Sequence, residues 1–344
     1  MSCRIIDRRT IVPKRIGRYR SFPGWTRTAD GDVLLAYRDA QSAPGTWSHG
    51  VAGDLVCCRE HAAAWSAPEV LYRHEAGLEE MGCGDLTRLA DGTILLWSRQ
   101  WNPAAHRTHG VFMAASDDDG RTFAPRHAIE LDVFGQGWAP YGKVLELTDG
   151  TLLQGAYGRR AGESLSASAC LESRDRGTSW RVRAWVATPE DGKGLNYFEP
   201  LMLARSDGAV VCLLRTNGTF YLTRSDDART WTPTEPAFAG MAAAGAVLAD
   251  GTLLVAYRGI HETHVDRARD AVKPRRGRLY NARTSADGGA TWDDECELDG
   301  RTAWQVGSYG MGDILHDGDA VRVVYYTSDE DQCPWIEEAV VAIE

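Results

Sequence analysis

The feature that most constrains the fold is a segment that occurs six times along the chain: Asp-Gly followed by an apolar run. Asp-Gly supplies the positive-φ residue that a tight hairpin needs, and the runs after it are rich in strand-forming side chains. Six such segments, with almost no helical periodicity between them, indicate radial repetition. A β-sandwich would not explain the sixfold count. The Asp residues of the six segments are Asp30, Asp91, Asp149, Asp207, Asp250 and Asp317.

A second repeat, Ser-x-Asp-x-Gly-x-Thr/Ser-aromatic, runs in step with the first. It occurs at 116–123, 173–180 and 285–292, and a copy at 225–231 is one residue short. A degraded copy, EHAAAW, follows the first Asp-Gly segment, and no copy follows the sixth. Together the repeats predict an all-β fold, a six-bladed β-propeller of four-stranded antiparallel blades that fills residues 1–344 as a single domain. The N-terminal strand CRIIDRRTIV is expected to pair in the last blade with EEAVVAIE and so close the ring.

Composition excludes several classes of partner. The net charge of −10 argues against nucleic acid and against an anionic membrane surface. No run approaches the roughly 20 apolar residues of a membrane span, and the first residues lack the apolar core of a signal peptide. The eight cysteines show no metal-ligand spacing with histidine, so we expect neither a metal nor an organic cofactor. The sequence predicts a reduced, cytoplasmic protein of undetermined oligomeric state, and secretion remains open.

The second repeat resembles the Asp-box, or BNR repeat, of the sialidase (neuraminidase) superfamily, and the resemblance extends over essentially the whole chain. In that family the box holds the outer hairpins, whereas the chemistry lies near the central axis at one face. The resemblance implies three arginines that grip a sugar carboxylate through bidentate bonds. It also implies an Asp acid/base and a Tyr nucleophile that is activated by a Glu.

Three segments match the catalytic positions of that family. NYFEPLMLARSDGAVVCLLR implies Glu199 as the base for the nucleophile and Arg215 as a carboxylate ligand. GSYGMGDILHDG implies Tyr309 as the nucleophile, although Gly-Met follows it where the family has a small polar residue. GDLVCCREHAAAW implies Asp54 as the acid/base carboxylate.

Two further segments supply the remaining arginines. RLYNARTSADGGATW implies Arg278 as a carboxylate ligand, with Arg258 as the rival candidate at the end of the preceding strand. YRSFPGWTRTADG implies Arg20 as the first ligand. However, RSFP has one residue more than the Arg-Ile-Pro of the family, so Ser21 takes the place of the arginine if Pro23 sets the alignment.

Other residues in the first two blades are candidates for substrate contact. Arg38, Arg99 and Trp101 lie at comparable strand ends, and Asp85 in GCGD is expected to face the centre. His49, which lies outside the sialidase pattern, is either an ordinary loop histidine or an acid/base group.

These residues predict a retaining exo-glycosidase that acts on a glycan with a terminal acidic sugar, sialic acid or a related nonulosonic acid. Two alternatives stay open. One is a glycosidase or lyase of the same superfamily that acts on uronic-acid-containing or other glycans, with His49 and Tyr309 as the acid/base pair. The other is a non-catalytic glycan-binding propeller, because fold does not imply function.

Overall fold

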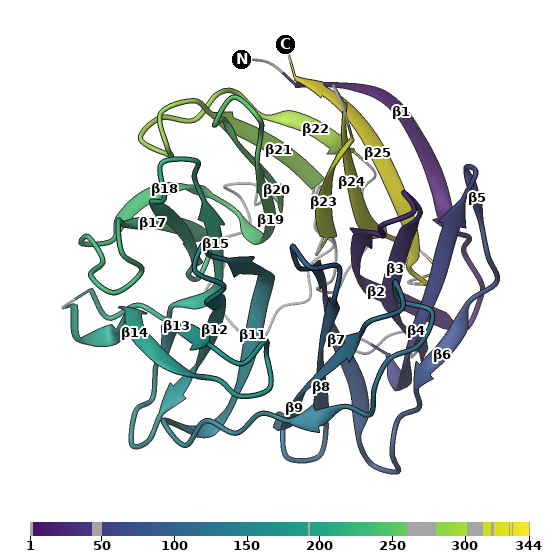
Figure 1. Ribbon diagram of the computed structural model, residues 1–344, viewed down its shortest axis with the longest axis horizontal. Helices are drawn as coiled ribbons and strands as arrows, with labels where there is room; N and C mark the ends of the chain where they lie inside the picture. The colour runs from purple at the N-terminus through teal and green to yellow at the C-terminus, as the bar shows by residue number, and fades with distance from the viewer. Residues whose placement is uncertain are drawn as a thin grey trace.

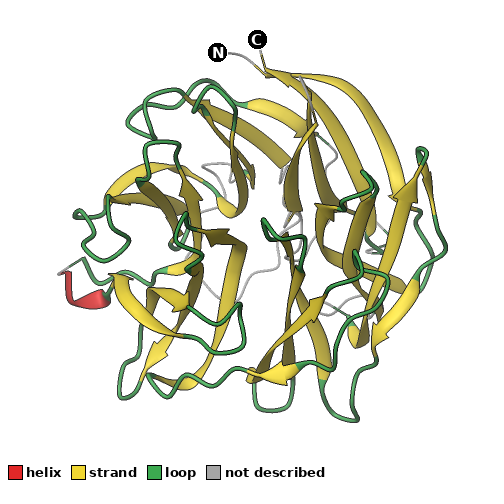
Figure 2. Cartoon of the chain, viewed as in Figure 1, coloured by secondary structure: helices red, strands yellow, loops and turns green. Residues whose placement is uncertain are grey.

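The computed structural model describes residues 3–42, 50–191, 193–259, 280–300, 312–317, 320–329, 331 and 333–343. Strands make up nearly all of the regular structure in this part of the chain, and its one helical element is a 3₁₀ turn, η1 (Pro189–Asp191) (Figure 2). None of its helical structure has the length and apolar composition needed to cross a bilayer. The all-β class expected from the strand-forming runs is confirmed.

Six antiparallel sheets surround a common centre, which confirms the six-bladed β-propeller (Figure 1). From the innermost strand outward, blade 1 consists of β2 (Arg18–Arg27), β3 (Val33–Gln41), β4 (Val51–His61) and β5 (Ala64–Trp65), with β6 (Glu69–Tyr72) also paired to β4. Blade 2 consists of β7 (Glu79–Arg88), β8 (Ile94–Asn102), β9 (Arg107–Ser116) and β10 (His127–Ala128). Blade 3 consists of β11 (Phe134–Glu146), β12 (Leu152–Arg160), β13 (Ser166–Ser173) and β14 (Arg181–Ala187).

The remaining blades continue around the ring in chain order. Blade 4 consists of β15 (Phe198–Ala204), β16 (Val210–Arg215), β17 (Thr219–Ser225) and β18 (Glu235–Ala239). Blade 5 consists of β19 (Met241–Val247), β20 (Leu253–Arg258), β21 (Tyr280–Ser285) and β22 (Cys296–Asp299). Blade 6 consists of β23 (Gly312–Asp317), β24 (Ala320–Thr327), β25 (Trp335–Ile343) and β1 (Cys3–Val12).

Blade 6 joins the two ends of the chain and closes the ring. The N-terminal strand β1 pairs antiparallel with the C-terminal strand β25, from Cys3 opposite Ile343 to Val12 opposite Ile336. The two ends of the chain lie side by side at the top of Figure 1. The pairing predicted between CRIIDRRTIV and EEAVVAIE is therefore confirmed.

The Asp-Gly pairs form the turns that were expected between the first and second strands of the blades. In blade 1 the Gly31 N–H donates to the Thr28 carbonyl at 3.2 Å with a φ of 91° at the glycine. The equivalent turn in blade 5 has Gly251 bonded to Leu248 at 2.9 Å with a φ of 88°. A side chain at either glycine would be strained in this left-handed conformation, which explains the recurrence of Gly.

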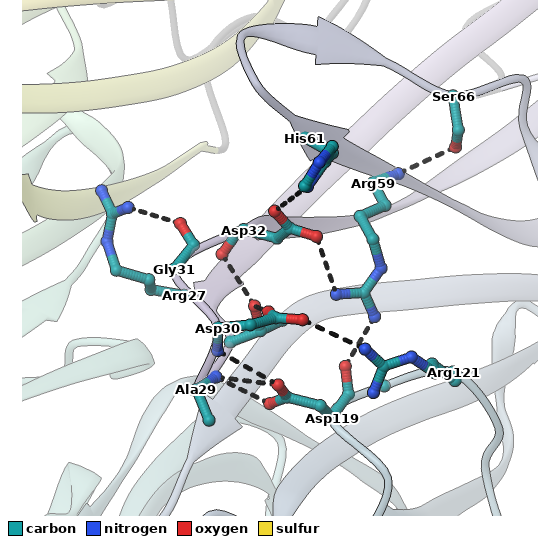
Figure 3. A network of polar contacts seen from close by, with 12 residues as sticks. Arg27, Ala29, Asp30, Gly31, Asp32, Arg59, His61, Ser66, Asp119 and Arg121 are labelled. Carbon is teal, nitrogen blue, oxygen red and sulfur yellow. Dashed lines mark hydrogen bonds and ion pairs between the residues drawn. The ribbon is translucent and has the colours of Figure 1, made fainter.

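The boxes form compact turns, and the box of blade 2 ties that blade to blade 1. In blade 2 the Gly120 N–H donates to Ser116 Oγ at 2.8 Å, and the Thr122 N–H donates to Asp118 Oδ1 at 2.8 Å. Hydrogen bonds from Thr122 and Ser116 lower the pKa of Asp118 to about 2. Asp119 then accepts the Ala29 N–H of the blade 1 hairpin at 2.8 Å (Figure 3).

Apolar clusters fill all six seams between neighbouring blades. The seam between blades 2 and 3 shows the part that a box tryptophan takes, because Trp180 packs on Trp97 with ring centroids 5.2 Å apart. In blade 1 the degraded box still places Trp65 against the seam with blade 6. A charged network accompanies it there, in which Arg322 contacts Glu60 at 2.7 Å and Glu338 at 2.5 Å.

A lysine from blade 3 links the innermost strands of three other blades. Lys143 Nζ donates to the Trp25 carbonyl of blade 1 at 2.6 Å and to the Leu86 carbonyl of blade 2 at 3.0 Å. It also lies 2.6 Å from the buried Asp313 carboxylate of blade 6. Burial raises the pKa of Asp313, and Lys143 opposes that rise. These contacts bridge the centre of the ring at the level of the inner strands.

Candidate functional site

The two ends of the ring carry different kinds of connection. The hairpin face bears the Asp-Gly turns and the boxes. The loop face, at the other end, bears the connections from second to third strand and from one blade to the next. Six of the predicted site residues lie at strand ends on the loop face: Arg20, Arg38, Asp54, Glu199, Arg215 and Arg258. The prediction of one functional face therefore agrees with where the strands place these residues.

Three of the innermost strands have a similar β-bulge near the loop face. Pairing shifts between Ser21 and Gly24 in β2, between Phe198 and Leu201 in β15, and between Met241 and Ala244 in β19. The first residue within each shift has a positive φ. The angle is 54° at Phe22, 48° at Glu199 and 52° at Ala242. Bulges next to active sites change the direction of a side chain. The positive φ of Glu199 is therefore a consequence of its position in the repeat.

The seventh residue after the glycine of each Asp-Gly pair, near the loop-face end of the second strand, is an arginine in four of the six blades. Across the two inner strands, the pairs are Ser21 with Arg38, Met81 with Arg99, Phe198 with Arg215 and Met241 with Arg258. In blades 3 and 6 the equivalent residues are Tyr157 and Tyr325. The loop face therefore carries a repeated arginine position in a chain of net negative charge.

The strongest catalytic candidate is the pair of Glu199 and Arg215 in blade 4. Arg215 Nη1 lies 2.5 Å from Glu199 Oε1, and the Arg215 guanidinium packs 5.7 Å from the Phe198 ring centroid. Burial acts to lower the pKa of Arg215, but the Glu199 carboxylate raises it overall. Among the described residues, Glu199 Oε2 and Arg215 Nε are buried without a hydrogen-bond partner. Each group therefore keeps unused hydrogen-bonding capacity.

The other three arginines of the repeated position have different surroundings. Arg38 is fully buried, and its Nη2 lies 2.6 Å from Glu79 Oε2 in blade 2. Arg258 is 6% exposed and donates from Nη2 to the Met241 sulfur at 3.2 Å. Arg99 is half-buried, lies 5.9 Å from the Trp101 ring centroid, and leaves its Nε without a partner among the described residues.

Arg20 is held by residues at the seam between blades 1 and 6. Its Nη1 donates to the Pro13 carbonyl, and its Nε lies 3.6 Å from Asp39 Oδ2. The bulge register places Ser21 at the position equivalent to Phe198, with Pro23 equivalent to Pro200. Pro23 and Pro200 therefore occupy equivalent positions in their blades, whereas the match of Arg20 or Ser21 to the first arginine of the family stays a prediction.

Asp54 contacts a histidine that the sequence did not single out. Oδ1 of Asp54 accepts hydrogen bonds from the His74 backbone N–H at 2.8 Å and from His74 Nδ1 at 2.7 Å. Arg73 Nη1 lies 3.8 Å from Oδ2. Partial burial acts to raise the pKa of Asp54, but the two His74 hydrogen bonds and the Arg73 charge lower it overall. Asp54 is therefore held as a carboxylate.

Two acidic residues at the start of β7 complete this part of the loop face. Burial raises the pKa of Glu79, and the charges of Arg38 and His74 oppose that rise. Glu80 is fully buried and binds Arg126 through both carboxylate oxygens, at 2.7 and 2.8 Å. No sequence motif predicted the roles of His74 and Arg126, because their contacts form where loops and strands that are distant in the sequence pack together.

The remaining predicted residues have no described side chain. His49, Arg278 and Tyr309 lie outside the described residues, and Asp85 lies in the bulge of β7 with its side chain outside the description. Within the described part of the chain, no group of three or more His, Cys, Asp or Glu side chains is arranged to hold a metal ion.

Comparison with known proteins gives a family and a set of structural neighbours. Residues 50–311 match the BNR repeat-like domain. The fold is similar to that of a protein of unknown function from Dyadobacter fermentans, with 21% identity, a TM-score of 0.81 and 99% of each chain covered. It is also similar to a Hadza microbial sialidase, with 17% identity and a TM-score of 0.69 over 94% of this chain and 66% of the sialidase.

A third similar structure is a variant of the NanB sialidase from Streptococcus pneumoniae. It has 10% identity and a TM-score of 0.67, over 97% of this chain and 70% of the sialidase. This chain thus spans about two thirds of these two sialidases. At such identities the likeness is one of fold. No curated protein sequence matches the chain.

Proposed function

Because this chain belongs to the BNR repeat-like domain family and has the propeller fold found in sialidases, we propose that it is a retaining exo-glycosidase. Its substrate is a glycan that ends in an acidic sugar, sialic acid or a related nonulosonic acid. The observation that carries the proposal is the Glu199–Arg215 pair on the loop face, with one carboxylate oxygen and one guanidinium nitrogen left unpartnered.

Arg215 is the group that holds the substrate carboxylate. A guanidinium binds a carboxylate through two parallel hydrogen bonds, and the positive charge is maintained here by Glu199. Arg99 in blade 2 is a second arginine of the repeated position whose Nε has no partner among the described residues. Arg278 is proposed as a further ligand on the strength of the resemblance. Arg20 is left out of this set because Pro13 and Asp39 hold it.

Glu199 and Tyr309 together provide the nucleophile. A carboxylate nucleophile would be repelled by a sugar that carries its own carboxylate at the anomeric carbon, whereas a tyrosine oxygen would not. The unpartnered Oε2 of Glu199 takes the phenolic proton while the tyrosine oxygen bonds to the anomeric carbon and the glycosidic bond breaks. The leaving oxygen receives a proton at the Asp54 side of the site, and water later releases the sugar.

The contacts of Lys143 support a site that is entered from the loop face. Lys143 joins the inner strands of blades 1, 2 and 3 and meets Asp313 of blade 6 at the centre of the ring. A glycan chain that enters from the loop face meets this bridge rather than an open axial passage. That arrangement suits removal of a terminal sugar.

The proposal is tested by hydrolysis of an aryl sialoside by the wild-type protein and by Tyr309→Phe. We expect release of the aryl alcohol by the wild type and a loss of about 10²-fold or more in Tyr309→Phe, because the nucleophile is removed. Tyr221→Phe, on β17 in the seam between blades 3 and 4, is the matched control and should retain the wild-type rate. Equal rates in the wild type and Tyr309→Phe would contradict the assigned role of Tyr309.

A further inference from the structure

His74 and Asp54 form a histidine–carboxylate pair on the loop face. Both the backbone N–H and Nδ1 of His74 approach the same oxygen of Asp54, at 2.8 and 2.7 Å. An ionised carboxylate can only accept hydrogen bonds, and the lowered pKa of Asp54 keeps it ionised. His74 Nδ1 must therefore carry a hydrogen, which leaves Nε2 as the nitrogen that can take up or release a proton.

The two side chains differ in what they offer to a substrate. The side chain of His74 is 35% exposed, and that of Asp54 is 17% exposed. Oδ1 of Asp54 is already engaged twice, and Oδ2 faces Arg73 at 3.8 Å. A carboxyl group with a lowered pKa is a poor proton donor near neutral pH, because it is almost never protonated. Asp54 is thus built to hold a proton donor rather than to be one.

Charged groups from several elements surround the imidazole of His74. Asp54 on β4 and Glu79 on β7 are acidic, and Arg73 on the same connection is basic. Arg38 on β3 forms an ion pair with Glu79. Glu75, one residue after His74, is bonded to Gln100. The imidazole therefore has a carboxylate fixing its Nδ1 side and a second carboxyl group nearby.

From this geometry we propose that His74 is the proton-transferring residue of the site and that Asp54 is the positioning residue that sets its tautomer. The inference rests on the proposed glycosidase function. In the first step the imidazolium form of His74 gives its Nε2 proton to the glycosidic oxygen as the C–O bond breaks and the Tyr309 oxygen bonds to the anomeric carbon, which leaves the neutral Nδ1–H tautomer of His74. In the second step neutral Nε2 takes a proton from water, whose oxygen attacks the same carbon and releases the tyrosine oxygen.

A matched control exists on the hairpin face. His61 Nδ1 lies 2.8 Å from Asp32 Oδ1, so the geometry of this pair is nearly that of His74 with Asp54 (Figure 3). His61 is at the end of β4 that carries the degraded box, and its side chain is 80% exposed. Because the His61–Asp32 pair lies on the hairpin face, we expect it to take no part in the reaction.

The test compares two sialosides in His74→Ala, Asp54→Asn and His61→Ala. A 4-nitrophenyl leaving group needs little protonation, whereas an alkyl leaving group needs a full proton. We expect kcat/KM of His74→Ala to fall about 10²–10⁴-fold for the alkyl sialoside and much less for the 4-nitrophenyl sialoside. Asp54→Asn should show the same preference with a smaller loss, added imidazole should restore part of the activity of His74→Ala, and His61→Ala should match the wild type.

Two results would overturn the inference. One is a leaving-group preference in Asp54→Asn that is absent from His74→Ala, which would make Asp54 itself the acid. The other comes from ¹⁵N NMR of the histidine rings, which needs no substrate and so separates this inference from the proposed function. At a pH at which the ring is neutral, we expect the Nδ1–H tautomer at His74 in the wild type and its loss in Asp54→Ala but not in Asp32→Ala. An Nε2–H tautomer in the wild type would reject the inference even if sialosides are cleaved.

Discussion

Arg38 in blade 1 and Arg215 in blade 4 occupy the same position of the repeat, yet their surroundings differ. Each lies opposite the residue where the inner-strand bulge begins, which is Ser21 for Arg38 and Phe198 for Arg215. Arg215 meets a carboxylate of its own blade, keeps 24% of its side chain exposed and leaves Nε unpartnered among the described residues. Arg38 is fully buried and reaches into blade 2 for its carboxylate.

The difference comes from small changes at neighbouring positions. The bulge residue next to Phe198 is Glu199. The equivalent residue in blade 1 is Phe22, which cannot form an ion pair with an arginine. Ser21 also offers no ring for the guanidinium to pack on. Gly53 of β4 leaves the space that Arg38 fills, since a Cβ there would lie 2.6 Å from Arg38 Cζ. The repeat thus sets the backbone, and the residues around it decide between substrate contact and structural support.

The largest expected effect comes from removing the negative charge of the Glu199–Arg215 pair. Glu199→Gln should lower kcat/KM on an aryl sialoside by about 10²–10⁴-fold, because the base for the nucleophile is lost. Glu79→Gln is the matched change at the buried pair, and we expect its cost to fall mainly on stability. Steady-state kinetics beside urea unfolding of both variants check this. The comparison breaks down if the two variants lose activity equally.

The second effect separates the two arginines by stability. Arg38→Met should lower the free energy of unfolding by about 3–5 kcal/mol, because Glu79 stays buried without its cation. Burial raises the pKa of Glu79 and Arg38 opposes that rise, so the variant raises this pKa further. A raised carboxyl pKa favours the folded state at low pH and loses that benefit as pH rises. The deficit measured by urea unfolding should therefore be smaller at pH 5 than at pH 8, and a larger deficit at pH 5 would argue against this origin.

A third effect tests whether Gly53 is what admits Arg38. Gly53→Ala should cost about 1–3 kcal/mol in urea unfolding, because the added Cβ overlaps the guanidinium. Shortening the side chain of Arg38 should relieve the overlap. The loss of unfolding free energy caused by Gly53→Ala should therefore be smaller in the Arg38→Ala background. Additive costs in the double variant would show that the methyl group acts elsewhere.

The smallest effect concerns the box, which blade 2 retains and blade 1 has lost. Asp118→Asn should reduce stability modestly at pH 7, since hydrogen bonds from Thr122 and Ser116 to the carboxylate are weakened. Those bonds lower the pKa of Asp118 to about 2. A lowered carboxyl pKa gives stability above the ordinary value that is lost as pH falls through the folded value. Urea midpoints of variant and wild type should converge as pH falls from 4 toward 2, and a constant gap would be inconsistent with this.

The fold was largely predictable because its turns are local. A few consecutive residues determine each Asp-Gly turn, as at Gly31 and Gly251, and each box, as at Ser116. The number of Asp-Gly segments predicted the number of blades. The ring closure was also predicted, from the positions of the two strands at the ends of the sequence. Glu199 and Arg215 lie close together because both are at the loop-face ends of adjacent strands, but the sequence analysis assigned them to the nucleophile and to the substrate and not to each other.

The rest of the candidate site was beyond the sequence for physical reasons. The contact between His74 and Asp54 depends on how the connection before β7 folds back onto β4, and no periodic pattern marks such a contact. The burial of Arg38 depends on Gly53 and on a carboxylate from the next blade. The position of Ser21 opposite Arg38, at the start of the bulge, depends on the strand register and not on a local motif.

The central claim is that Arg215, and not its counterpart Arg38, meets the acidic sugar. Isothermal titration calorimetry of N-acetylneuraminic acid with the wild type, Arg215→Lys and Arg38→Lys tests it most directly, because lysine keeps each ion pair charged but cannot bind a carboxylate bidentately. We predict affinity about 10–100-fold weaker for Arg215→Lys, and a value within about twofold of the wild type for Arg38→Lys. Equal affinities in Arg215→Lys and the wild type, or a larger loss in Arg38→Lys, would contradict the claim.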